Sequence, residues 1–470
     1  MITKELYFSK LKKYSFKALV DRVSKEDPSN KVLEGRNTLR IGGVTVASTD
    51  DNPCNPVTLT GILTDLSELP FNKKTRKTVS HDELLELCKT RNVVLPIEKG
   101  TFAKGKGLGS VFASSFVQSL FLFKESLPQN YLRSYYIFTE IDKLMASDKG
   151  KYLSSKSFFD KLCNCDCLIT FVMLLLLYEE TIQSGKRFFK KPFTIYEQFF
   201  VNHFDNNEIV FSPNNREKYN PLRHCLIHIG NTYYIPSLGS FYHRLSDLFY
   251  WVYKDFCKKN IKISNFFPSR FGYYFEEYIN QYLKYNLGDN NYKRLDEIID
   301  SDSNKKPDFE FQRCNYKFVV ECKSRLIAFK DVDNKLCTGH FREDIEDGLS
   351  QLQSFKKEED FIRIIVLYEN TFPILELFEN ELRRRMSLNE KYWIITVNEF
   401  ESLMDVAEGE DFEKVINYRL TKLKSDTPVS LGQCLKDCNV GYEYSRFYLE
   451  HIEKTVNEAA KDIVDAFNSI

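Results

Sequence analysis

The stretch Lys305–Ser324, KKPDFEFQRCNYKFVVECKS, decides the fold of the region around it. Its second half alternates, and four side chains fall on one side of an extended chain: Lys317, Val319, Glu321 and Lys323. Three less polar side chains fall on the other side: Phe318, Val320 and Cys322. A period of two residues is the mark of a β-strand. The pattern therefore predicts a strand whose last polar residues, Glu321 and Lys323, project from the same face.

A second strand is predicted just before it, over Asp308–Arg313, and Arg313–Tyr316 predicts the hairpin between the two. This pairing brings two carboxylates, Asp308 and Glu321, and the ammonium of Lys323 to one point. Carboxylate oxygens are the ligands that hard divalent cations prefer. The stretch therefore predicts a site that can hold a divalent cation and activate water.

Pro307-Asp308 followed by Glu321-Cys322-Lys323 on adjacent strands resembles the PD-(D/E)XK superfamily of restriction-endonuclease-like nucleases. The resemblance covers about residues 264–403. It implies a DNA endonuclease that uses Mg²⁺ or Mn²⁺, with Asp308, Glu321 and the main-chain carbonyl of Cys322 as metal ligands. Such a metal lowers the pKa of a bound water and stabilises charge on the scissile phosphate.

Two roles stay open for Lys323. It would orient or help to deprotonate the attacking water, and it would offset negative charge on the phosphate. A lysine beside a metal can have its pKa lowered, which is what a base requires.

The superfamily places a helix before the strands, and Ser269–Leu287 predicts one, with Ser269 as its N-cap. At 100° per residue, Glu276 falls at the edge of the apolar stripe, whereas Glu277 falls roughly opposite and should face solvent. Gly272-Tyr-Tyr-Phe-Glu276 also resembles the GxxFE helix of the superfamily. We therefore expect Glu276 to reach the site, with an ordinary surface acid as the alternative.

The elements that follow complete an αβββαβ order, which the resemblance implies. Tyr292–Ile299 predicts the first core strand. The later elements are expected as helix, strand, helix and strand, over Asp344–Glu358, Phe361–Tyr368, Ile374–Met386 and Lys391–Val397. The last two strands are continuously apolar, as strands covered on both faces should be.

Several polar residues flank this core. Many relatives carry a glutamine on the helix after the strands, and Gln351 is the residue here that matches, with a solvent-facing position equally open. Arg325, Lys330 and Arg342 are candidates for contacts with nucleic-acid phosphates. Such contacts position a duplex without distinguishing its sequence.

The length and composition of the chain limit the classes of protein to which it can belong. With 470 residues, it has the length of about two to four domains. Its 66 basic and 66 acidic residues balance, which excludes a globally basic nucleic-acid binder but allows a local basic groove. The N-terminus lacks an apolar signal segment, and Leu168–Tyr178, the most apolar run, is far shorter than the ~20 residues that cross a bilayer. We expect a cytoplasmic protein, with reduced cysteines and no membrane contact.

The predicted fold class is α+β and multidomain. Residues 1–100 form a mixed α/β region, 101–262 a mainly helical region, 263–404 the nuclease domain and 405–470 a C-terminal helical extension. Leu39–Ala47 predicts a strand pair, and Ser80-His-Asp-Glu83 predicts a capping box at a helix start.

We expect residues 1–262 to restrain the nuclease, through a trigger, a regulatory partner protein or homo-oligomer formation. By analogy with stand-alone defence nucleases, the setting would be bacterial defence against foreign DNA. Two alternatives stay open. One is an RNA-cleaving nuclease of the same fold, and the other is a non-catalytic nucleic-acid-binding or scaffold protein.

Overall fold

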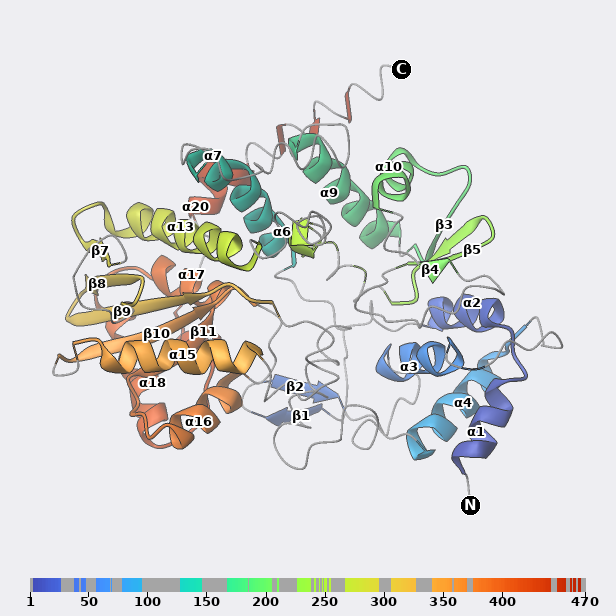
Figure 1. The fold of residues 1–470 in the computed structure, drawn as a ribbon, viewed down its shortest axis with the longest axis horizontal. Coiled ribbons are helices and arrows are strands. Elements are labelled where there is room, and N and C mark those ends of the chain that lie inside the picture. Colours follow the sequence, from blue (N-terminus) through green and yellow to red (C-terminus); the bar gives the residue numbers. More distant parts are fainter. Residues whose placement is uncertain are drawn as a thin grey trace.

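The computed structural model has a mixed α/β fold (Figure 1). It describes single positions at 69, within 241–254 and within 457–465, and these continuous ranges: 3–26, 38–41, 44–47, 56–67, 78–94, 127–145, 167–184, 186–204, 209–210, 226–237, 267–295, 306–326, 340–356, 359–369, 375–440 and 446–453. Within these ranges, no helix combines the length and the apolar character needed to span a membrane.

A five-stranded sheet in the order β11-β10-β9-β8-β7 forms the centre of the C-terminal half. β7, β8 and β9 are antiparallel neighbours, whereas β9, β10 and β11 run parallel. The strand bounds in chain order are Tyr292–Arg294, Phe309–Arg313, Tyr316–Lys323, Phe361–Leu367 and Tyr392–Thr396. All five strands were predicted. β7 ends at Arg294, and residues 296–299 of the predicted first strand lie outside the described ranges.

Helices cover both faces of this sheet (Figure 1). α13 (Phe267–Leu287) covers one face, while α15 (His340–Ser354) and α16 (Leu375–Arg385) cover the other. β10 is buried along its whole length. Its residues alternate between the core beneath α13, with Ile362, Ile364 and Val366, and the core beneath α15, with Phe361, Ile365 and Leu367. A strand without a solvent face has no polar side, which explains why every residue of β10 except Arg363 is apolar.

The β8–β9 hairpin sets the register of the central pair. Its turn contains two residues, and the first, Cys314, has a positive φ of 50°. Phe309 lies opposite Val320. The residue before Phe309 is Asp308, which therefore lies beside Glu321 at the end of the pair.

α13 carries the predicted apolar stripe, and its six predicted members are all buried: Phe271, Phe275, Tyr278, Ile279, Tyr282 and Leu283. The helix begins at Phe267, earlier than predicted. Ser269 therefore lies inside the first turn, and its prediction as the N-cap was wrong. Pro268 at the second helical position is compatible with this earlier start, since the N–H groups of the first turn have no partner within the helix.

The N-terminal region combines helices with a short ribbon. β1 (Thr38–Ile41) and β2 (Val44–Ala47) form the predicted antiparallel pair. The predicted capping box starts α4, because the Glu83 N–H donates to Ser80 Oγ at 3.2 Å and the Ser80 N–H donates to Glu83 Oε2 at 2.9 Å. The helices α1 to α4 span Lys4–Leu11, Phe16–Glu26, Pro56–Ser67 and His81–Val94.

The region predicted as mainly helical also contains a sheet, so that prediction holds only in part. Its strands, in the order β3-β6-β5-β4, contain two or three residues each, too few to show a period of two. β3 to β6 span Phe188–Lys190, Ile209–Val210, Ile227–Ile229 and Thr232–Tyr234. The helical elements are α6 (Leu127–Tyr136), a π-helical turn η2 (Ile137–Ile141), α7 (Asp142–Met145), α9 (Cys167–Ser184) and α10 (Ile195–Phe204). α9 contains the apolar run Leu168–Tyr178, and five of its residues are buried in the core: Phe171, Val172, Leu174, Leu177 and Tyr178.

The chain after β11 is helical and packs on the side of the sheet that α13 covers. α17 to α20 span Val397–Asp405, Glu410–Lys424, Leu431–Asp437 and Arg446–Tyr448. A second π-helical turn, η4 (Leu449–Glu453), follows α20 directly. The predicted amphipathic helix over residues 444–470 therefore contains a π-helical turn, and most of its remainder lies outside the described ranges.

Candidate active site

Three of the predicted site residues meet at one end of the five-stranded sheet, where β8 begins and β9 ends. Lys323 Nζ donates to Glu321 Oε1 at 2.6 Å. Asp308 Oδ2 accepts the Cys322 N–H at 2.6 Å. Glu321 is almost fully buried, at 4% exposure. The hairpin register thus brings together the two carboxylates and the ammonium that the sequence placed at one point.

The main-chain carbonyl of Cys322 points towards the same place. In an antiparallel pair, a hydrogen-bonded residue directs its N–H and its C=O to the same neighbouring strand. The Asp308 N–H donates to the Val320 carbonyl at 2.9 Å, and the Cys322 N–H donates to the Asp308 side chain. The Cys322 carbonyl therefore faces the side of Asp308, where β8 no longer covers it.

Glu276 approaches the site from α13, on the opposite face of the sheet. Its Oε1 lies 3.9 Å from the point where a Cβ on Gly272 would stand, and Ser324 Oγ lies 3.7 Å from that point. Its charge also contributes to raising the pKa of Asp308. Glu276 thus lies near the end of β9, where the sequence analysis placed it.

Glu277 has a different position from the one predicted. Its side chain is only 14% exposed and pairs with Arg294 of β7 at 2.6 Å, so the expectation that it faces solvent was wrong. It also accepts hydrogen bonds from Asn280 and Gln281. The antiparallel strand β7 runs close to this side of α13, and a helical-wheel argument cannot include a strand that packs there.

The site contains more buried acid than base. Burial raises the pKa of Asp308 well above its usual range, and Glu321 and Glu276 raise it further. Burial alone would lower the pKa of Lys323, but Glu321, Asp308 and Asp344 outweigh it and raise that pKa. Lys323 therefore keeps its positive charge, but its effect on Asp308 is smaller than that of the Glu321 and Glu276 carboxyl groups. An additional cation would relieve this imbalance.

The backbone of α15 reaches the site at Gly348. A Cβ at this position would lie 2.7 Å from Lys323 Cε and 3.3 Å from Glu321 Cγ, closer than side chains normally pack. Glycine within a helix costs about 0.5–1 kcal/mol relative to alanine. Gly348 was not among the site residues predicted from the sequence. A single glycine in the middle of an amphipathic helix was the available signal.

Gln351 follows Gly348 by three positions, so both residues occupy the same face of α15. The side chain is partly buried, and its Oε1 is buried with no hydrogen-bond partner among the described residues. A buried acceptor of this kind needs a donor. Gln351 therefore does not have the fully solvated position that was its alternative.

The residues predicted to contact phosphates differ in exposure and in the ion pairs that they form. Arg325 pairs with Asp344 and keeps 39% of its side chain exposed at the rim of the site. Arg342 is only 11% exposed and pairs with Glu346 at 2.6 Å and Glu381 at 3.0 Å, which ties α15 to α16. Lys330 lies outside the described residues. The described geometry thus favours Arg325 over Arg342 for a contact with nucleic acid.

The donor set suits a hard divalent cation, because the Asp308 and Glu321 carboxylates and the Cys322 carbonyl are oxygen ligands. The buried excess of acid around Asp308 is the structural observation that fits such an ion. Within the described ranges, no three His, Cys, Asp or Glu side chains already form a metal-binding group. The hydrogen bonds from Cys322 and Lys323 would have to be shared or rearranged around an ion.

Comparisons with known proteins give no match: no family model matches the chain, and neither a curated protein nor a solved structure is significantly similar to it. What the site does must therefore be argued from its geometry and its motif.

Proposed function

We propose that this protein is a divalent-metal-dependent endonuclease that hydrolyses phosphodiester bonds of DNA. One observation carries the proposal. Asp308, Glu321 and Lys323 lie together at the end of a buried strand pair, with an excess of acid that a cation would balance. The order of α13, β7, β8, β9, α15 and β10 supports a restriction-endonuclease-like core.

Each residue has a distinct part in the proposed reaction. Asp308, Glu321 and the Cys322 carbonyl would hold Mg²⁺ or Mn²⁺, which when bound supplies Lewis acidity and an activated water. Lys323, which stays protonated beside Glu321, would neutralise charge that develops on the scissile phosphate. Glu276 and Gln351 would orient the attacking water or the phosphate.

DNA is the proposed substrate, and defence against foreign DNA the proposed setting, through the resemblance of the motif alone. Arg325, at the rim of the site, would contact a phosphate and so position the strand. Residues 1–262 would restrain the enzyme or recruit a partner.

A cleavage assay with Mg²⁺ or Mn²⁺ tests the proposal on duplex DNA, single-stranded DNA and RNA in parallel. The wild-type protein should cut DNA, while Asp308→Ala and Lys323→Ala should each lose at least about a hundredfold in rate, as the removal of one preorganised charge-stabilising group does. Lys317→Ala is the matched control, because Lys317 lies on the same strand and face as Lys323 but is 53% exposed and pairs with Glu359. Absence of cleavage by the wild type, or equal cleavage by Asp308→Ala, would refute it. Cleavage of RNA alone would change the substrate.

A further inference from the structure

Residues 186–191, KRFFKK, interleave four cationic residues with two phenylalanines. β3 spans three of these residues and forms one edge of the sheet β3-β6-β5-β4, which lies on the opposite side of the molecule from the five-stranded sheet (Figure 1). Along β3, Phe189 is buried in the core, whereas Phe188 and Lys190 are exposed. Since side chains two positions apart point to the same side of a strand, an aromatic ring and an ammonium share one face.

The ring of Phe188 is supported from one side only. Phe188 pairs across the strands with Tyr234 of β6, and the two ring centroids lie 6.4 Å apart. Tyr234 is 6% exposed, whereas Phe188 is 40% exposed. A buried ring thus holds Phe188 in place while much of the Phe188 ring stays open to solvent.

The charges around this segment leave a surplus of cations. Lys186 pairs with Glu197 at 2.5 Å and with Glu180 at 3.4 Å. Lys190 and Lys191 are both exposed, and within the described part of the chain no carboxylate pairs with either of them. Uncompensated positive charge therefore lies next to the exposed ring, and its natural complement is an anion.

The edge of β3 is poorly suited to a strand from another protein. It contains only three residues, and Pro192 follows closely after it. Short edge strands, lysines and proline are the features by which proteins prevent pairing at a sheet edge. The exposed ring of Phe188 is therefore not explained by a protein strand that pairs with β3.

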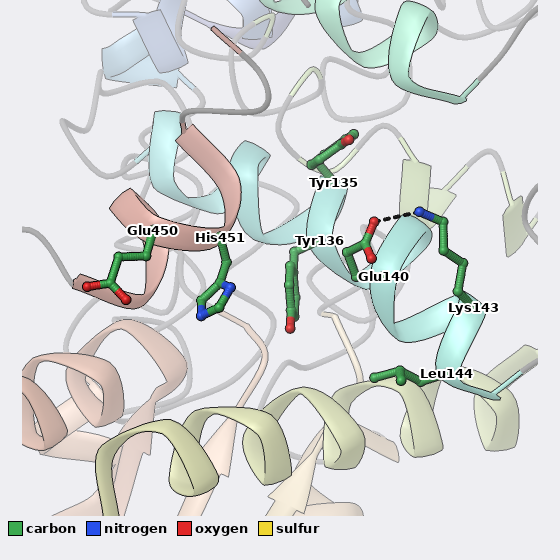
Figure 2. A pocket seen from close by; sticks show the side chains of 7 residues that line it. All are labelled: Tyr135, Tyr136, Glu140, Lys143, Leu144, Glu450 and His451. Atoms are coloured by element: carbon green, nitrogen blue, oxygen red, sulfur yellow. Dashed lines mark hydrogen bonds and ion pairs between the residues drawn. The ribbon is translucent and has the colours of Figure 1, made fainter. Parts of the chain in front are cut away.

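The cleft between residues 135–144 and η4 has the opposite charge balance (Figure 2). Lys143 is the one lysine among its described lining residues, and it pairs with Glu140 at 2.7 Å. Glu450 on the other wall adds a carboxylate. Phosphate groups are therefore attracted to the β3 edge more strongly than to this cleft.

We propose that residues 186–191 bind single-stranded nucleic acid, with a base stacked on Phe188 and the backbone phosphates near Lys190 and Lys191. Aromatic side chains stack on any base, since every base has a π-face, and cationic groups follow the backbone. A duplex keeps its bases inside the stack, so the ring of Phe188 favours a single strand. The inference does not depend on cleavage at Asp308, because it assigns to part of residues 1–262 the binding of a strand away from the candidate active site.

Fluorescence anisotropy of a labelled oligothymidylate tests the contribution of the lysines, with the full Asp308→Ala chain in metal-free buffer. This parent chain should bind the strand less tightly as the salt concentration rises. Lys190→Gln/Lys191→Gln should lower the slope of log affinity against log salt by about 1.4, since each phosphate contact of a single strand contributes about 0.7. Lys12→Gln/Lys13→Gln is the matched control, because it removes two adjacent exposed lysines elsewhere, and it should leave the slope unchanged.

Substitutions of Phe188 test the stacking contact. Phe188→Leu keeps an exposed apolar side chain but removes the ring, and it should weaken oligothymidylate at least about fivefold without a change in the salt slope. Phe188→Tyr should bind as the parent chain does. Leu6→Ala is the control, since Leu6 is an apolar residue of α1 that is 43% exposed. A duplex of the same length should bind equally well to Phe188→Leu and to the parent chain.

Four results would overturn the proposal: no binding of the strand, equal slopes for the two lysine double variants, equal affinity of Phe188→Leu and Phe188→Tyr, or a vesicle result. In the last case, Lys190→Gln/Lys191→Gln would lose binding to vesicles of anionic phospholipid while it keeps the oligothymidylate, which would assign the surface to a membrane. A wild-type chain that binds the strand through Phe188 but cuts no nucleic acid would refute the proposed function and leave this inference standing.

Discussion

Two buried charged clusters contact the same sheet, one beneath α13 and one at the end of β8 and β9, and they differ in the ratio of basic to acidic groups. Beneath α13, Arg133 and Glu401 are each about 1% exposed and pair at 2.7 Å. Glu401 also accepts from Tyr278 at 2.7 Å and from Tyr448 at 3.0 Å. One guanidinium thus meets one carboxylate, and phenolic hydroxyls supply further hydrogen bonds.

The cluster at the end of β8 and β9 lacks this balance. The carboxyl groups of Glu321 and Glu276 and the ammonium of Lys323 all act on Asp308, and the carboxyl groups outweigh the ammonium. A buried pair that is fully hydrogen-bonded needs nothing further, whereas a buried excess of acid is poorly stabilised without another cation. The comparison therefore separates a cluster whose charges neutralise one another from one that retains an excess of buried acid.

The largest expected effect concerns the balanced cluster. Arg133→Met should lower the free energy of unfolding by about 3–5 kcal/mol, because it leaves Glu401 buried without its cation. Urea denaturation measures the loss. Arg384→Met, which removes the exposed pair with Asp426, should leave the free energy of unfolding nearly unchanged. The double variant Arg133→Met/Glu401→Leu should recover much of the stability. If the double variant does not recover stability, Arg133 and Glu401 contribute more to the fold than the neutralisation of each other's charge.

A smaller effect is expected where α15 touches the unbalanced cluster. Gly348→Ala places a Cβ against Lys323 and Glu321 and should lower the cleavage rate at least about tenfold, since small misplacements of reacting groups are costly. Stability should change by no more than about 1 kcal/mol, because alanine favours the helix and the Lys323 side chain can move. Gly432→Ala in α19 is the control, since its Cβ would meet nothing within 4 Å. Equal rates for both variants would remove Gly348 from the site.

The smallest effect has the opposite sign. Asp308→Asn should raise the free energy of unfolding by about 0.5–2 kcal/mol at pH 7.5 in metal-free buffer. The folded-state pKa of Asp308 is raised, so ionisation destabilises the fold once the pH exceeds the unfolded value of about 3.9. The gain should disappear below that pH. Asp289→Asn, at a position 66% exposed, should show no such gain. A loss of stability in Asp308→Asn at neutral pH would contradict the idea of excess acid.

Local sequence patterns were sufficient to predict much of the C-terminal half. Period two placed Glu321 and Lys323 on one face, a two-residue turn fixed the register with Asp308, and apolar runs marked β10 and β11. These features depend on neighbours within a few residues. The αβββαβ core and its superfamily stay a proposal.

Features that depend on distant partners could not be predicted. Arg133 and Glu401 are 268 residues apart, and no local pattern joins them. The partner of Glu277 became visible only when β7 was placed beside α13. Arg342 is of a residue type that often contacts phosphate, yet α16 supplies the carboxylate of Glu381, which pairs with it. In each case packing, rather than periodicity, decides the partner.

Titration of Mn²⁺ into the protein, followed by calorimetry, tests most directly whether the unbalanced cluster is a metal site. The wild-type chain should bind the ion, and Asp308→Asn and Glu321→Gln should each weaken binding at least about tenfold, because each removes a charged oxygen ligand. Arg133→Met/Glu401→Leu should bind as the wild type does. Unchanged binding in both Asp308→Asn and Glu321→Gln would contradict the account.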